Sequence, residues 1–301
     1  MNSVALPGRA AAPAPLLVPA LLACYLVWGS TYLAIRYALV SFPPFFQMGT
    51  RFLTAGALLM AWVLWQARRG AARMPTPREW RNALVIGALM LGGGMGLTAS
   101  AEQHIGSGLI AAFIAVVPML VCGWGLLFGQ RPGRLELAGM LVGVAGVLLL
   151  VRGASFGASP QGLAAIAGAT LAWSLGSVLS TTRLPLAPGP AGFASEMLCG
   201  GAVLMALSLA MGEQFGAPPQ RLALAAWIYL VVFGSLVAFS AYLYLLAHAS
   251  PALATSYAFV NPVIALALGV LLGGEVLSGG EWAACGVILA GVLLIFRGKT
   301  A

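Results

Sequence analysis

GVLLLVRG at residues 146–153 returns almost unchanged as GVLLIFRG at residues 291–298. These two stretches lie 145 positions apart (146 to 291), and sliding the chain on itself by this distance brings most of its length into register. The other aligned pairs include Trp28 with Trp173, Arg51 with Glu196 and, at a shift of 144, His104 with His248 and Pro118 with Pro262. A fixed internal period predicts a chain built from two copies of one structural unit.

The composition is that of a membrane protein. Of the 301 residues, 61% are hydrophobic and only 7% are charged, whereas soluble domains carry roughly 25% charged residues. Apolar runs of the length that a bilayer requires, about 17–25 residues, occur throughout the chain. The predicted spans are residues 16–38, 44–66, 83–102, 106–128, 135–151, 161–181, 191–211, 223–246, 251–272 and 282–297.

Each copy of the repeat therefore holds five predicted helices. Because five is odd, the second copy begins on the opposite side of the membrane and has the inverted orientation. The expected fold is an all-α membrane protein of ten transmembrane helices, arranged as two inverted five-helix repeats around a central cavity. Residues 1–15 are expected to form a disordered cytoplasmic tail, residues 16–153 the first repeat and residues 161–298 the second repeat.

The loop charges predict the orientation in the membrane. Residues 67–81, ARRGAARMPTPREWR, hold five arginines, and the side of the membrane on which they lie receives eleven of the fifteen cations. The positive-inside rule places this side, with both termini, in the cytoplasm. We expect a multi-pass protein of the bacterial inner membrane, in which this bias explains the net charge of +8. Binding of nucleic acid is not expected, because no basic domain lies outside the membrane.

Neither a metal nor a cofactor is expected. The four cysteines are isolated in apolar runs, without CxxC spacing or a histidine cluster, and are interpreted as reduced packing residues. A catalytic site is not expected either, because the sequence lacks HExxH and GxSG motifs and paired aspartates. A phosphorylated solute is disfavoured because the chain has only one lysine, Lys299, although arginine is an alternative phosphate ligand.

Matched interruptions of helices point to a binding site at the middle of the membrane. Pro118 and Pro262 fall near the midplane of the fourth and ninth spans, and Asn261 adds an amide beside the second proline. The third helix of the first repeat has small residues where the third helix of the second repeat has large ones. Gly93, Gly94 and Thr98 are expected on an emptied wall, opposite an aromatic wall of Tyr242 and Tyr244 that Trp28, Trp124, Trp173 and Tyr257 extend. The alternatives are prolines that only bend their helices and aromatic rings that face lipid.

Two charged residues, Arg51 and Glu196, lie within predicted spans at equivalent positions of the two repeats. Each is seven residues or less from its own membrane surface in the predicted topology, so the two are not expected to pair directly. One interpretation is that Arg51 anchors a solute carboxylate or acts as a gating element. The alternative is that the side chains of Arg51 and Glu196 each extend toward their nearest membrane interface. His104 and His248 are either proton-coupling groups or ordinary interfacial residues.

Several stretches resemble the EamA family of the drug/metabolite transporter superfamily. They are YLVWGSTYLAIRYAL at residues 25–39, PPFF at 43–46, RFLTAGALL at 51–59 and GGEVLSGGEWAACGVILAGVLLI at 273–295. The resemblance covers residues 16–298 as two copies, and departs from the pattern at GQRPGRLE, residues 129–136. It implies ten helices, cytoplasmic termini, a central cavity and alternating access. Characterised members with this resemblance include exporters of aromatic amino acids.

The sequence thus predicts a secondary transporter that moves small organic solutes. Export of amino acids or related metabolites with aromatic or bulky side chains is favoured, and the expected partners are the solute and the lipid bilayer. A monomer suffices, because the path lies within one chain. The alternatives are a membrane-embedded enzyme and a structural bundle without transport activity.

Overall fold

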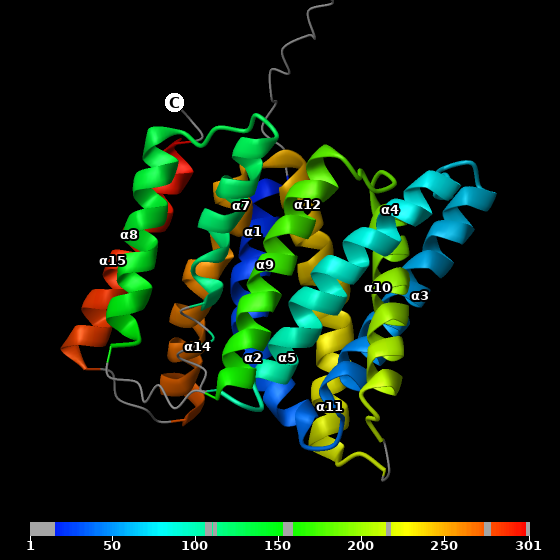
Figure 1. Cartoon of the computed structure of the whole chain (residues 1–301), viewed down its shortest axis with the longest axis horizontal. Coiled ribbons are helices and arrows are strands. Elements are labelled where there is room, and N and C mark those ends of the chain that lie inside the picture. Colours follow the sequence, from blue (N-terminus) through cyan, green and yellow to red (C-terminus); the bar gives the residue numbers. More distant parts are fainter. Residues whose placement is uncertain are drawn as a thin grey trace, which may run out of the picture.

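The computed structural model describes residues 16–105, 110, 113–152, 159–214, 218–273 and 278–298, and these segments are predominantly helical. Within them, seven helices are long and apolar enough to cross a membrane. The helices stand side by side in one bundle (Figure 1). The seven are Leu17–Leu39 (α1 Leu17–Leu22, η1 Ala23–Val27, α2 Trp28–Leu39), α3 Pro44–Arg68, Pro77–Ala101 (α4 Pro77–Gly87, η2 Ala88–Gly96, α5 Leu97–Ala101), α9 Pro160–Thr182, α10 Pro190–Ala210, Arg221–His248 (α11 Arg221–Tyr229, η3 Leu230–Phe239, α12 Ser240–His248) and α15 Gly279–Gly298.

The three other predicted spans fall on shorter helices. These are α7 Val117–Leu127, α8 Arg134–Leu150 and the pair α13 Pro251–Thr255 and α14 Tyr257–Gly273. The described residues therefore form an all-helical, multi-pass membrane fold, whereas the count of ten spans stays a prediction. The predicted tail, residues 1–15, lies outside the described residues.

Proline begins many of these helices. It is the first residue of α3, α4, α9, α10 and α13, where its missing N–H costs nothing and its fixed φ suits the helix. Residues before the proline cap the remaining donors. Ser159 accepts a hydrogen bond from the backbone of Gly162, and Thr76 forms a capping box with Glu79. Local sequence therefore sets where the helices start.

Glycines bring two pairs of helices into backbone contact. A Cβ atom added to Gly56 of α3 would lie 2.9 Å from the backbone nitrogen of Leu198 in α10, and one added to Gly201 would lie 2.9 Å from that of Leu53. Gly56 is equivalent to Gly201, and Leu53 to Leu198, at a shift of 145, so the two contacts are counterparts of each other. Small residues allow this approach in a membrane, where apolar burial cannot drive helix association.

The same reciprocity occurs between α8 and α15. An added Cβ at Gly146 would lie 2.8 Å from the backbone nitrogen of Ile288, and one at Gly291 would lie 2.7 Å from that of Gly143. Gly146 is equivalent to Gly291, and Gly143 to Ile288, at a shift of 145, so the two contacts are again counterparts of each other. Both close helix pairs therefore join equivalent parts of the two sequence repeats.

The third helix of each sequence repeat is π-helical in its middle. The π-helical segments are η2 (Ala88–Gly96) and η3 (Leu230–Phe239). A π-helix closes its hydrogen bonds five residues apart instead of four, which is rare and frequent at functional sites. Both segments pack close to α2 or α9, and this arrangement positions the cavity described below.

Candidate solute cavity

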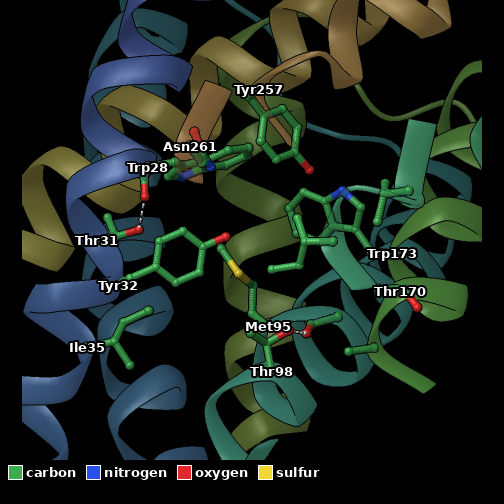
Figure 2. A pocket seen from close by; sticks show the side chains of 14 residues that line it. Trp28, Thr31, Tyr32, Ile35, Met95, Thr98, Thr170, Trp173, Tyr257 and Asn261 are labelled. Carbon is green, nitrogen blue, oxygen red and sulfur yellow. Dashed lines mark hydrogen bonds between the residues drawn. The ribbon is translucent and has the colours of Figure 1, made fainter. Parts of the chain in front are cut away.

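A cavity with about 70 Å³ of internal space lies between α2, η2, α5, α7, α9 and α14. Figure 2 shows the rings of Trp28, Trp173 and Tyr257 toward one end, the ring of Tyr32 in the middle, and Met95 and Thr98 toward the other end. Among the described residues, its lining carries no charged side chain. The lining residues are Trp28, Thr31, Tyr32, Ile35, Gly94, Met95, Thr98, Ile114, Val117, Ala169, Thr170, Trp173, Tyr257 and Asn261.

Four aromatic rings from four helices close one end of the cavity. In this aromatic cluster, Trp28 lies edge-on to Tyr257 with ring centroids 4.7 Å apart and to Trp173 at 5.7 Å. Tyr242 stacks on Trp173 at 5.2 Å and shares a hydrogen bond of 2.8 Å with Ser177. Trp28, Trp173 and Tyr257 face the cavity, whereas Tyr242 is fully buried behind them.

The cavity occupies only one half of the bundle. Its residues in α2 run from Trp28 toward the C-terminal end at Ile35, and its residues in α9 run from Trp173 toward the N-terminal end at Ala169. On the other side of the aromatic cluster, Cys24 and Ala238 are fully buried and touch through a contact of 3.6 Å from Sγ to the carbonyl oxygen. We call this packed region the closed end.

One aligned pair of residues accounts for the difference between the two ends. Thr98 occupies in the first sequence repeat the place that Tyr242 holds in the second. The Thr98 hydroxyl donates to the carbonyl of Gly94 at 2.7 Å, so the side chain lies against its own helix and leaves space beside it. The Tyr242 ring fills the equivalent space at the closed end.

Of the glycines expected on the emptied wall, Gly94 lines the cavity and Gly93 does not. A Cβ atom added to Gly94 would lie 2.8 Å from the ring of Trp173, whereas one added to Gly93 would lie 2.7 Å from Ala172 in α9. Gly94 therefore makes room beside the Trp173 ring, and Gly93 allows two helices to approach.

Of the other predicted site residues, some line the cavity and others lie outside its lining. Asn261 lines the cavity, and Pro262 follows it inside α14. Trp124 donates through Nε1 to Ser174 at 3.1 Å, outside the lining. Tyr244 points elsewhere and stacks on His248 with centroids 4.1 Å apart. Pro118 is buried at the start of α7, one residue after the lining residue Val117.

Arg51 and Glu196 are both fully buried inside the protein, and neither lines the cavity. The guanidinium of Arg51 donates through Nε to Ser235 Oγ at 2.7 Å. Neither carboxylate oxygen of Glu196 has a hydrogen-bond partner within the described part of the chain. Neither side chain therefore extends to an interface.

Several lining residues escaped the sequence reasoning but follow helical spacing from residues that it found. Thr31, Tyr32 and Ile35 lie three, four and seven positions after Trp28, which places them on one face of α2. Ala169 and Thr170 precede Trp173 by four and three positions in the same way. Helical periodicity from the two tryptophans is the sequence signal that points to these residues.

Comparison with known proteins gives consistent matches. The model of the EamA-like transporter family matches residues 16–152 and again residues 160–297. The chain is 43% identical over 281 residues to the uncharacterized inner membrane transporter YedA of Escherichia coli K12, covering 93% of this chain and 90% of that protein. It is 27% identical to protein PecM of Dickeya dadantii, covering 90% of this chain and 86% of that protein.

A solved structure shares the fold. A crystal structure whose name states no activity superposes with a TM-score of 0.77 at 22% sequence identity, covering 94% of this chain and 97% of the other. At this identity the likeness concerns the fold alone.

Proposed function

Because the chain belongs to the EamA-like transporter family, we propose that it carries small organic solutes across the membrane by alternating access through the described cavity. The uncharged aromatic cavity is the observation that carries this proposal. Its rings offer flat apolar surfaces, while Thr31, Thr98 and Asn261 offer hydrogen bonds. These groups suit a solute with a flat or bulky apolar part and a few polar atoms.

Alternating access is supported by the internal repetition. In the glycine contacts of α3 with α10 and of α8 with α15, each contact has a counterpart between the residues equivalent at a shift of 145, as expected of two equivalent halves related by a twofold axis. Two inverted five-helix repeats, ten helices in all, would exchange conformations to move the opening from one membrane face to the other. In the proposed topology both termini are cytoplasmic, and the cavity described here opens toward the opposite face.

Amino acids with aromatic or bulky side chains are the favoured solutes. The rings of Trp28, Trp173 and Tyr257 provide stacking and edge contacts for an aromatic side chain. Export is the proposed direction, by analogy with exporters of the family. A membrane-embedded enzyme remains the other class of function, but the family description and the name of the YedA relative both denote transport.

The test is a solute panel on purified protein in liposomes. Amino acids are offered first, with and without an imposed proton gradient, and counterflow of labelled solute is measured against protein-free liposomes. We expect saturable counterflow of aromatic amino acids, which an excess of the same unlabelled solute abolishes. Counterflow of small aliphatic amino acids alone would reject the aromatic preference, and the absence of counterflow across a broad metabolite panel would reject transport.

A further inference from the structure

The guanidinium of Arg51 is buried beside the cavity without a counter-charge. Its side chain is fully buried, and the one ion pair among the described residues joins Arg73 to Glu79 instead. Arg51 Nε donates to Ser235 Oγ at 2.7 Å, Nη1 contacts Met48 Sδ at 3.6 Å and Nη2 has no partner among the described residues. Burial of an unpaired charge lowers stability, so the bundle would tolerate an apolar residue here more easily.

Arg51 is linked to the cavity through Gly234 of η3. A Cβ atom added to Gly234 would lie 2.6 Å from Arg51 Nη2 and 3.3 Å from Thr31 Cγ2, so the guanidinium lies directly against this glycine and any larger residue would displace it. The carbonyl of the same Gly234 accepts a hydrogen bond of 3.2 Å from Trp28 Nε1. Arg51, the Gly234–Ser235 turn and Trp28 therefore form one contiguous chain of contacts.

Trp28 occupies a central place in the site. Its ring lines the cavity and contacts Trp173, Tyr242 and Tyr257 at centroid distances of 5.7, 5.2 and 4.7 Å. The hydrogen bond to Gly234 is the polar contact that fixes the orientation of this ring. A shift of the Gly234 carbonyl would therefore turn the ring surface that a solute meets.

We propose that Arg51 is a positioning residue for solute binding, which holds the Gly234–Ser235 turn so that its carbonyl orients Trp28 across the cavity. This inference rests on the proposed transport through the cavity. The planar fork of arginine donates to Ser235 through Nε while Nη2 lies beside Gly234, a geometry that the single ammonium of lysine does not reproduce. Charge alone is therefore insufficient, and Arg51→Lys should behave like Arg51→Met.

The test follows the Trp28 ring directly. Full-length protein labelled with 5-fluorotryptophan is studied by ¹⁹F NMR, and Trp28→Phe identifies the Trp28 resonance. Arg51→Met and Arg51→Lys should both shift this resonance. The matched control is Arg69→Met, because Arg69 stacks over Trp65 with its Cζ 3.8 Å from the ring centroid and neither residue lines the cavity. This control should shift the Trp65 resonance and leave that of Trp28 in place.

Kinetics then separate positioning from folding. In liposomes, Arg51→Met should raise KM about tenfold, the scale of one misplaced aromatic contact, with Vmax per folded protein little changed. Trp28→Phe should raise KM similarly, and the double variant should add little, because both changes break one link. The control Arg69→Met should keep the wild-type KM.

Each outcome decides the inference. An unmoved Trp28 resonance in Arg51→Met, an unchanged KM, or fully additive effects with Trp28→Phe would overturn it. If Arg51→Met does not fold, Ser235→Ala removes the 2.7 Å hydrogen bond alone and must shift the same resonance. If the wild-type protein transports no solute, the proposed function fails, and the resonance alone decides whether Arg51 positions Trp28.

Discussion

The third helices of the two sequence repeats share one backbone conformation but differ in the size of their side chains. They are Pro77–Ala101 and Arg221–His248. Both are π-helical in the middle, at η2 and η3. In the first, Gly94 and Thr98 leave space that becomes the cavity, whereas in the second the ring of Tyr242 fills the closed end. The comparison teaches that side-chain volume on a repeated frame determines which end of the cavity is open.

The closed end must open if the protein transports by alternating access. Tyr242 contacts the rings of Trp28, Trp173 and Tyr257, and each aromatic pair is worth about 0.5–1.5 kcal/mol beyond burial. Their sum is a few kcal/mol, which is the size of the gap between exchanging conformers of a protein. The aromatic cluster is thus strong enough to favour one state and weak enough to be broken.

The largest expected effect comes from filling the open side. Gly94→Leu would place a branched side chain in the cavity beside Trp173, where an added Cβ already lies 2.8 Å from the ring. We expect counterflow to be lost while the protein remains folded in detergent. The measurement is counterflow per folded protein, with folding followed by size-exclusion chromatography and thermal unfolding.

An exposed glycine outside the cavity lining provides the control for this substitution. A Cβ atom at Gly123 of α7 would have no neighbour within 4 Å, so Gly123→Leu adds the same bulk without filling the cavity. It should transport at the wild-type rate. Wild-type counterflow by folded Gly94→Leu would show that solutes do not pass between η2 and Trp173.

The second effect concerns access to the two ends. In a background without native cysteines, Thr98→Cys lies in the cavity wall and Ala238→Cys lies in the fully buried closed end. In the proposed topology the closed end opens only toward the cytoplasm, so we expect a membrane-impermeant thiol reagent, added outside intact cells, to label Thr98→Cys and to leave Ala238→Cys unlabelled. Equal labelling rates would reject the assignment of open and closed ends.

Orientation in the membrane is tested in the same background. Ala71 and Gln220 are exposed turn residues on opposite sides of the predicted topology. Gln220→Cys should label from outside and Ala71→Cys only after the membrane is permeabilised. The reverse pattern would place the cavity opening on the cytoplasmic face.

The sequence repeat predicted the central part of the site, because symmetry brings equivalent residues to the bundle axis. Trp28 and Trp173 are equivalent at a shift of 145, and their rings do meet in the structure at 5.7 Å. Gly94 and Thr98 were found from the loss of bulk relative to the second repeat, and both line the cavity. These predictions needed only the alignment of the chain with itself.

The sequence reasoning was less successful with the directions of neighbouring side chains. Successive residues of a helix are about 100° apart around its axis. Gly93 and Gly94 therefore do not face the same way, and neither do Tyr242 and Tyr244. Tyr244 accordingly turns away to stack on His248. The π-helical segments add to the difficulty, because they change the rotation per residue and leave no clear signal in an apolar sequence.

The smallest expected effect comes from a single hydroxyl at the closed end. Tyr242→Phe keeps the ring contacts and removes the 2.8 Å hydrogen bond to Ser177. Ser177 still donates to the carbonyl of Trp173 at 2.7 Å, so no buried donor is left unpaired. The cost is then that of one ordinary hydrogen bond, about 1 kcal/mol, which corresponds to about a fivefold shift in equilibrium toward opening of the closed end.

Cys24 reports this opening directly, because it is fully buried at the closed end against Ala238. With the other three cysteines replaced, its labelling rate by a small permeant thiol reagent is proportional to the fraction of molecules in which this end is open. Tyr242→Phe should raise that rate about fivefold. The control Tyr37→Phe, at a 40% exposed ring of α2, should leave it unchanged. If both variants label at the wild-type rate, the Tyr242–Ser177 hydrogen bond does not hold the closed end, and ring packing alone keeps it shut.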